Sequence, residues 1–328
     1  MGDKDVFIGV DAGATKTVAI AITTEWLYVG HGFSGPGNPA SIGVIDSCRN
    51  IYRAISSAIK YERELKPVFI GAGLAGWLGG AWDSNLSDCI SSMLGIDRGS
   101  IEIIEDLEAA HYSAFLGGDG IIAILGTGSS FLGISRGRRI RVGGWGHLIG
   151  DEGGSWRIGI IGLRAVYRSL DGRLEPTSLV ERALRRFGAR DPQDLLKIIY
   201  SGGNIKSLIA SFAIDIFQAA REGDRVAIRI LKEEAEEIAI AYRAIADKIG
   251  VLPLAIVGST YHANKDIWGP MIRRAIVSYV GREVEIRDPV LSQECSSLLL
   301  ALSRRGLLSG DRKDLPPECL FKQRSSED

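Results

Sequence analysis

Residues 6–22 consist of two short apolar runs, rich in β-branched residues, on either side of a turn of small residues. This pattern predicts a β-hairpin in which Asp11 ends the first strand. Gly13 can supply a positive φ and a bare backbone. The turn continues with two hydroxyls and an ammonium group, and its consecutive N–H groups can form an anion-binding concavity; these residues are Thr15, Lys16 and Thr17. An acid beside such a concavity suits a divalent cation that bridges it to phosphate. The alternative is an ordinary polar hairpin turn.

A second segment, residues 120–135, repeats the order of strand, Gly-rich turn and strand. Its turn consists of Gly126, Thr127, Gly128 and Ser129. The two hairpins resemble the phosphate loops of the sugar kinase, Hsp70 and actin superfamily. A third run, from Gly143 to Ser155, reads Gly-Gly-Trp-Gly-His-Leu-Ile-Gly-Asp-Glu-Gly-Gly-Ser and closely resembles a signature of the N-acetylglucosamine kinase-like branch. The resemblance covers about residues 6–308.

This resemblance implies an α/β chain of two ribonuclease H-like domains, the actin-like ATPase fold, with a cleft between them. We expect an N-terminal domain over residues 1–118 and a C-terminal domain over residues 119–290. Residues 291–309 should form a terminal helix that returns to the N-terminal domain. Residues 310–328 are polar, contain Pro316-Pro317 and are expected to form a loose tail.

The resemblance also implies an ATP-dependent kinase that uses Mg²⁺ and acts on a small-molecule sugar. Asp11 would hold the metal through water, and Asp106 would be the general base toward the attacking hydroxyl, most simply O6. Residues expected to contact ATP lie in both turns and after a later strand: Gly13, Thr15, Lys16, Thr17, Gly126, Thr127, Gly128, Ser129, Gly258 and Ser259. The expected sugar contacts are Asn38, Asp106, Gly144, Trp145, Gly146 and Asp151.

Several of these residues have simpler interpretations. Asp106 follows a predicted strand over 101–104, so it could be the N-cap of the next helix, and Glu105 is its rival as the base. Leu107 and Glu108 depart from the pattern of the branch, as does Ser259, where the superfamily commonly has glycine. Trp145 could simply pack, and the Asp151-Glu152 pair could cap a helix.

Residues 71–76 read Gly-Ala-Gly-Leu-Ala-Gly, which is literally the G-x-G-x-x-G spacing of a dinucleotide-binding loop. That fingerprint should open a helix at once, but Trp77-Leu-Gly79-Gly80 follows, and this is poor helix material. The NAD-binding interpretation is therefore disfavoured. No Gly-Lys dipeptide occurs in the chain, which excludes a Walker A loop.

The remaining elements follow from hydrophobic spacing. Helices are expected over 43–64, 84–94, 156–170, 224–249, 266–280 and 293–305. Strands are expected over 27–29, 254–257 and 283–287, and a further strand is expected to lead into the glycines of residues 68–76. In the helix over 224–249, one apolar stripe contains Val226, Ile230, Ile238 and Tyr242, which is a core pattern and not a cofactor site.

Composition narrows the class of protein. The net charge of −1 offers no global field for nucleic acid, and no apolar run is long enough to span a bilayer. The N-terminus is too polar for a signal peptide, so we expect a cytoplasmic protein. The four cysteines have no CxxC spacing, and we expect reduced, mostly buried thiols. Scarce Gln with abundant Ile and Arg leans toward a thermophile.

Alternatives within and beyond the kinase class remain open at this point. Glucosamine or a broad range of hexoses could replace N-acetylglucosamine as the substrate. A non-kinase ATP-dependent activator or a sugar-sensing switch would use the same phosphate turns. The activators of this fold carry an iron–sulfur cluster on paired cysteines, and no such pair is evident. Relatives are often dimers, so a homodimer is possible.

Overall fold

The computed structural model describes residues 4–59, 64–76, 80–201, 205–308 and 315–321. They fall into two compact units, one from Met1–Gly118 and Pro289–Ser325, the other from Asp119–Asp288. No helix among the described residues is both long and apolar enough to cross a membrane.

Unit 1 is built on a five-stranded sheet of order β3-β2-β1-β4-β5. The predicted first hairpin is confirmed: β1 (Asp5–Ala12) and β2 (Thr17–Thr23) pair antiparallel, with Ala12 opposite Thr17. β3 (Tyr28–Ser34) extends the predicted third strand and pairs antiparallel with β2. β4 (Lys66–Leu74) and β5 (Ile101–Glu105) run parallel to β1, so the carboxyl ends of these three strands share one edge of the sheet.

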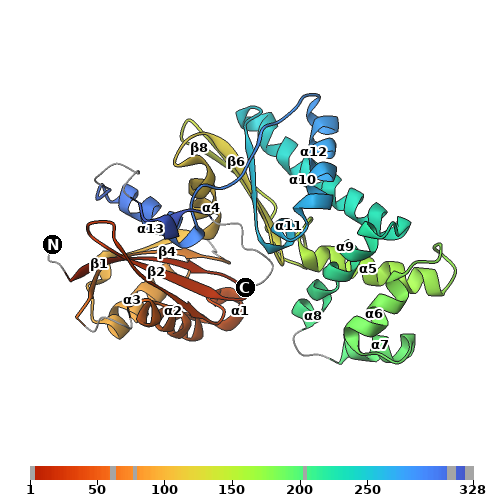
Figure 1. Cartoon of the computed structure of the whole chain (residues 1–328), viewed down its shortest axis with the longest axis horizontal. Coiled ribbons are helices and arrows are strands. Elements are labelled where there is room, and N and C mark those ends of the chain that lie inside the picture. The colour runs from red at the N-terminus through yellow and green to blue at the C-terminus, as the bar shows by residue number, and fades with distance from the viewer. Residues whose placement is uncertain (1–3, 60–63, 77–79, 202–204, 309–314, 322–328) are drawn as a thin grey trace. The chain divides into compact units, whose positions relative to one another are not determined.

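Helices cover both faces of this sheet (Figure 1). On one face lie α1 (Pro39–Ile42), α2 (Val44–Ala58) and α3 (Asp83–Leu94), and Ile51, Ile55 and Leu86 pack there against Ile8 and Val10. On the other face α13 (Gln293–Arg304) packs on β1 and β4, and α4 (Asp106–Phe115) packs on α13. The short helix η1 (Arg98–Ser100) precedes β5.

Two glycines allow α13 to lie directly on the sheet. A Cβ at Gly9 of β1 would overlap the carbonyl oxygen of Glu294, and a Cβ at Gly71 of β4 would lie 2.6 Å from the carbonyl oxygen of Ser297. Gly73 is similarly close to the hydroxyl of Ser297. Two glycines of the G-x-G-x-x-G run are therefore strand residues that accept a helix, and the next helix begins only at Asp83. This geometry contradicts a dinucleotide-binding loop; residues 77–79 lie outside the described part.

Unit 2 repeats the same strand pattern in its sheet, of order β10-β9-β6-β7-β8. β6 (Gly120–Leu125), β7 (Ser129–Ser135) and β8 (Arg138–Val142) form an antiparallel meander, which confirms the second predicted hairpin. β9 (Leu254–Val257) runs parallel to β6, and β10 (Ile286–Arg287), shorter than predicted, runs parallel to β9. The repeated order is that of a duplicated core.

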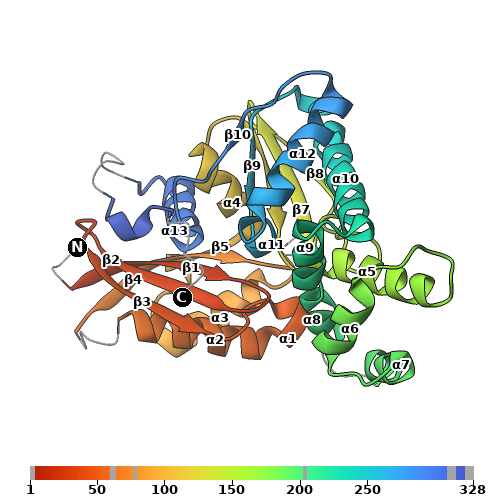
Figure 2. The ribbon, with the colours of Figure 1, turned by 45° about the vertical axis from the view of Figure 1, so that its right-hand side comes forward.

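Most of the remaining chain of unit 2 is helical. α10 (Arg225–Ile249) packs on β7 and β8 and runs beside α12 (Lys265–Val280), as Figure 2 shows. The short α11 (Ser259–His262) follows β9. The other helices are α5 (Ser155–Leu170), α6 (Leu179–Phe187), α7 (Pro192–Tyr200), α8 (Ile205–Ser211) and α9 (Ala213–Arg221).

The expectation of reduced thiols is wrong in this structure. Cys48 of α2 is bonded to Cys89 of α3, and Cys295 of α13 is bonded to Cys319. The partners are 41 and 24 residues apart in sequence, and only the packing of the fold brings them together. Pairing of this kind cannot be deduced from cysteine spacing.

The expected loose tail is also wrong for the segment that the structure describes. The short helix η3 (Pro317–Cys319) places Cys319 in the core, with 0% of its surface exposed. Leu320 forms a bridge with Leu291, so this segment is tied to the start of α13. Residues 309–314 and 322–328 lie outside the described residues.

Candidate functional site

In unit 1, the predicted residues gather at the carboxyl ends of the parallel strands. Asp11 of β1 is paired with Gly73 of β4, and Leu74 of β4 is paired with Glu105 of β5. Asp106 begins α4 directly after β5. Ligand sites of open α/β sheets form at this edge. Residues far apart in the sequence thus share one edge through the register of three strands.

The β1–β2 turn is closed by a hydrogen bond from the amide of Gly13 to the carbonyl of Lys16, at 2.9 Å. Gly13 is not in the left-handed region, contrary to expectation; a Cβ at this position would lie 3.1 Å from the Lys16 carbonyl oxygen. Thr15 and Lys16 are exposed. Thr17 is buried, and its hydroxyl donates to the carbonyl of Gly35 at 2.9 Å. The Thr17 side chain therefore ties the turn to the next loop.

That next loop holds Asn38. The amide of Gly37 donates to the Gly13 carbonyl at 2.9 Å, so the loop lies against the phosphate turn. Asn38 is the N-cap of α1, and its Oδ1 accepts from the amide of Ala40 at 2.9 Å. Gly76, with φ of +70°, approaches the Asn38 side chain so closely that a Cβ there would overlap Oδ1. The Asn38 side chain is therefore fixed near the ends of β1 and β4.

Asp11 lies in an environment with excess negative charge. Burial, assisted by the Glu294 carboxylate, raises the pKa of Asp11 to about 7, and Lys16 opposes the shift. Burial acts to raise the pKa of Glu294, but the hydrogen bond and charge of His31, together with hydrogen bonds from its own backbone and from Ser292, outweigh burial, and the Glu294 pKa is lowered. Nε2 of His31 lies 3.3 Å from Oε1 of Glu294. A cation beside Asp11 would relieve this charge.

The charge arrangement at Asp11 fits a magnesium ion. Mg²⁺ is usually held by one or two carboxylates together with water and phosphate oxygens, not by a full protein cage. The described residues contain no cluster of three or more His, Cys, Asp or Glu suited to a metal, so a site built wholly from protein ligands is not found there. His31 and Glu294 were not predicted; they come from β3 and α13, which only the fold brings together.

Asp106 is the first residue of α4, and the N-cap is Glu105, so the alternative interpretation of Asp106 as the N-cap does not hold. Its Oδ1 accepts from the amide of Leu107 at 2.8 Å. Asp106 is partly exposed, whereas Glu105 is 4% exposed. Glu108, one of the departures from the branch pattern, is paired with Arg304 of α13 at 2.6 Å. Of the two rival acids, Asp106 is thus the less buried.

In unit 2, the turn of the second hairpin is held from two sides. The amides of Ser155 and Trp156 donate to the carbonyls of Gly126 and Thr127, at 2.9 and 3.1 Å. The hydroxyl of Thr260 donates to the Gly126 carbonyl at 2.7 Å. Thr260, a buried residue of α11, was not predicted and links the turn to the end of β9.

Small residues make this close packing possible. A Cβ at Gly128 would lie 2.6 Å from Oδ2 of Asp151, and one at Gly154 would lie 2.8 Å from Cα of Gly128. Gly258 has φ of +110°, and a Cβ there would overlap the backbone of Leu125. The turn, the Asp151–Ser155 loop and the Gly258–Ser259 turn, all singled out in the sequence, are therefore one packed assembly.

Asp151 is a non-glycine residue with φ of +65°, and it is 5% exposed. Its Oδ1 accepts from the amide of Ser129 at 3.4 Å. The N-cap of α5 is Gly154, with no side-chain capping bond, so Asp151 and Glu152 do not cap this helix. A left-handed conformation in a non-glycine residue costs of order 1 kcal/mol or more and persists only where its surroundings enforce it.

The Gly144–Gly146 segment presents its tryptophan outward. Gly144 and Gly146 have φ of +73° and +85°, and a Cβ at Gly144 would lie 2.5 Å from the hydroxyl of Ser130. Trp145 is 70% exposed, which contradicts the interpretation that it packs in the core. The indole is available for contact with a ligand.

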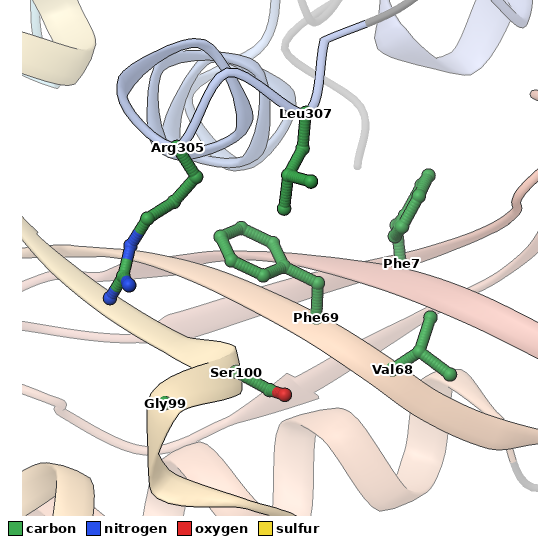
Figure 3. Close-up of a pocket in the computed structure, with 7 residues that line it drawn as sticks. All are labelled: Phe7, Val68, Phe69, Gly99, Ser100, Arg305 and Leu307. Atoms are coloured by element: carbon green, nitrogen blue, oxygen red, sulfur yellow. The ribbon is translucent and has the colours of Figure 1, made fainter.

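A pocket lies at the other end of the unit 1 sheet, and none of the residues that line it is a predicted site residue. Arg305 and Leu307 follow α13 and lie over Phe69, with Phe7 beside it (Figure 3). Phe7 lies near the start of β1, whereas Asp11 lies at its end. The residues that line the pocket are Phe7, Val68, Phe69, Gly99, Ser100, Arg305 and Leu307.

Comparison with known proteins adds independent information. Residues 8–294 match the model of the BadF/BadG/BcrA/BcrD ATPase family. An N-acetylmuramic acid/N-acetylglucosamine kinase of Clostridium acetobutylicum is 34% identical over 256 residues, 77% of this chain and 83% of that protein. Glucosamine kinase GspK of Vibrio cholerae is 27% identical over 278 residues, 83% of this chain and 90% of that protein.

A solved structure, that of a putative N-acetylglucosamine kinase from Chromobacterium violaceum, has a similar fold. Its TM-score is 0.73 at 23% identity, and the match covers 90% of this chain and 98% of that one. The predicted fold class, an α/β chain of two ribonuclease H-like domains, is confirmed by this match and by the two five-stranded sheets.

Proposed function

The chain belongs to the BadF/BadG/BcrA/BcrD ATPase family, and from this premise we propose that it is an ATP-dependent sugar kinase. Its substrate is N-acetylglucosamine or a related hexose or amino sugar, phosphorylated at O6. The main support within the molecule is the gathering of Asp11, Asn38 and Asp106 at one edge of the unit 1 sheet. The names of the similar kinases point to the same class of reaction.

In this proposal, both hairpin turns bind the phosphates of ATP. The β1–β2 turn offers the exposed Thr15 hydroxyl and the Lys16 ammonium, while the buried Thr17 hydroxyl holds the turn in shape. The β6–β7 turn offers backbone groups and the Thr127 hydroxyl. Gly258, which is partly exposed, would contact the base or ribose of the nucleotide through its backbone. Such turns take the place of the helix N-terminus that a Walker A loop would use.

Asp11 would hold Mg²⁺ through water, with Glu294 as the second nearby carboxylate. When bound, the ion neutralises charge on the phosphate oxygens during phosphoryl transfer. His31 contributes to the lowered pKa of Glu294 and so helps to maintain the negative charge that attracts the cation.

Asp106 acts as general base in this proposal. The carboxylate of this partly exposed residue accepts the proton of the attacking hydroxyl, and the hydrogen bond from the Leu107 amide to Oδ1 orients it. Phosphoryl transfer needs little covalent chemistry from the protein, so positioning of the sugar hydroxyl supplies much of the rate. Asn38, the Gly144–Gly146 backbone, Trp145 and Asp151 would provide that positioning.

The 2-substituent of the sugar is assigned on similarity. The Trp145 and Asp151 segment resembles that of N-acetylglucosamine kinases, and this makes N-acetylglucosamine the first choice. Glucosamine and N-acetylmuramic acid, the substrates named for the similar kinases, come next.

An ATP-driven switch is the second candidate, because the family is described as one of ATPases. An activator with a cluster on cysteine thiolates is disfavoured: all four cysteines of the chain are described and all are in disulfides. We further propose a cytoplasmic location, where ATP is available. Persistent disulfides in that compartment would be consistent with a hyperthermophilic source.

The acceptor position can be tested with one analogue. We expect ADP release from Mg·ATP with N-acetylglucosamine to fall at least about 10²-fold when 6-deoxy-N-acetylglucosamine replaces it, because the attacking hydroxyl is absent. The 6-deoxy sugar should still inhibit competitively, which shows that it binds. Undiminished ADP release with the 6-deoxy sugar would move the acceptor to another hydroxyl.

A further inference from the structure

α10 carries a carboxylate where its apolar stripe requires a hydrophobic residue. Glu234 lies four residues after Ile230 and four before Ile238, both of which are buried, and it is itself 1% exposed. Burial of a carboxylate is costly unless hydrogen bonds and charges compensate for it. Hydrophobic packing in the core of unit 2 therefore does not explain why this position carries a carboxylate.

The two oxygens of Glu234 contact the loop that follows Asp151. Oε2 accepts a hydrogen bond from the amide of Gly153 at 2.7 Å. Oε1 lies 3.5 Å from Nε of Arg157, in the first turns of α5. Gly153 has φ of +82°, and a Cβ there would lie 2.8 Å from Cγ1 of Ile238, so the loop backbone lies directly on α10.

The loop held in this way is the one that carries the strained Asp151. The amide of Gly154 donates a hydrogen bond to the Asp151 carbonyl at 2.9 Å. The amide of Ser155 donates a hydrogen bond to the carbonyl of Gly126, in the turn of the second hairpin. Because the left-handed conformation of Asp151 must be enforced by its neighbours, an anchor two residues away is a direct means of enforcing it. Glu234 thus supplies a side-chain anchor for the loop backbone between Asp151 and Ser155.

We propose that Glu234 is a positioning residue: by accepting the Gly153 hydrogen bond it holds Asp151 in the orientation that binds the sugar. This inference rests on the proposed sugar-kinase function. In this proposal, Oε2 of Glu234 supports the sugar contact because it accepts the Gly153 hydrogen bond. The negative charge of Glu234 is paired with Arg157. Burial raises the pKa of Glu234 to about 7, opposed by the Gly153 hydrogen bond and Arg157 and assisted by Glu237. The carboxylate is thus kept at a cost to folding, as expected for a residue retained for a site.

The test compares two substitutions that differ in the acceptor. Glu234→Met fills the core but cannot accept the Gly153 hydrogen bond, whereas Glu234→Gln keeps an acceptor oxygen. We expect the Met variant to raise the KM for the sugar at least tenfold, with less than a threefold change in the KM for ATP. The Gln variant should stay within threefold of wild type for both. Glu233→Gln, at an exposed position on the same helix, is the matched control and should leave both constants unchanged.

A merely structural role would lower the melting temperature of Glu234→Met without changing the KM for the sugar, and that result in a folded variant would overturn the proposal. If the Met variant does not fold, amide hydrogen exchange on the wild-type protein decides. The Gly153 amide should be protected as well as the buried turns of α10, and rapid exchange at Gly153 alone would contradict the anchor. A wild-type protein that phosphorylates no sugar would refute the proposed function, while the exchange measurement would still test the anchor.

Discussion

Replacement of Asp106 by Asn is expected to lower kcat at least about 10²-fold while sugar binding stays within several-fold of wild type. The carboxylate is the proposed proton acceptor, and an amide cannot accept a proton at neutral pH. The structure predicts that the rest of the site survives the change. Asn retains the oxygen that accepts from the Leu107 amide, and the N-cap of α4 is Glu105, so the start of the helix does not depend on Asp106.

The measurement is steady-state kinetics with calorimetric sugar binding on the same preparation. A loss of about 10²-fold corresponds to about 2.7 kcal/mol of transition-state stabilisation. The control is Asp97→Asn, which changes an exposed acid before η1 and should retain full turnover. An Asp106→Asn variant with wild-type kcat would move the base elsewhere, first to Glu105 and then to Asp151.

The second large effect is expected at Asp11. Asp11→Ala and Asp11→Asn should both abolish Mg²⁺-dependent turnover, because the proposed metal carboxylate is removed in each. Asp5→Asn, at the opposite end of the same strand, is the matched control and should remain active. Activity of the Asp11 variants at saturating Mg²⁺ would show that the assignment of the first phosphate turn is wrong.

The stability of the Asp11→Asn variant should change in the opposite direction from its activity. Burial raises the pKa of Asp11 from its ordinary 3.8 to about 7, and Glu294 contributes to the rise. Between about pH 4 and pH 7 the folded chain therefore holds a proton that the unfolded chain has released, so this group's contribution to stability is lost as the pH rises.

Asn does not titrate, so Asp11→Asn should be more stable than wild type at pH 8, by roughly 1–3 kcal/mol in the free energy of unfolding. The difference should shrink toward zero as the pH falls to about 4. Urea unfolding at several pH values, without Mg²⁺, measures this directly. Equal stability of the two proteins at pH 8 would show that Asp11 is not held in a destabilising environment.

Local pattern was sufficient to predict many of the individual helices and strands, whereas the two-domain architecture was predicted from the resemblance to the actin-like ATPase superfamily. The two hairpins follow from alternation of apolar runs and small-residue turns, and α10 follows from its apolar stripe. The G-x-G-x-x-G run has the spacing of a dinucleotide-binding loop, but in this fold its first two glycines make room for a helix that packs on the sheet. Gly71 and Gly73 are small because a helix from near the end of the chain lies on them.

The features that could not be predicted depend on contacts between distant segments. The disulfides require α2 beside α3 and α13 beside the segment near Cys319. The His31–Glu294 pair requires β3 beside the start of α13. Glu234 left a detectable signal, a carboxylate at the spacing of a core stripe, but its partner Gly153 is found only in the fold.

The most direct test of the proposed kinase function is ADP release from Mg·ATP by the purified protein. The panel contains N-acetylglucosamine, glucosamine, glucose, N-acetylmannosamine and N-acetylmuramic acid, with a reaction without sugar as reference. We expect strong stimulation by one or more sugars, with N-acetylglucosamine first and one sugar phosphate formed for each ADP. ADP release at the same rate with and without every sugar would contradict the kinase and leave an ATP-driven switch as the better account of the two turns.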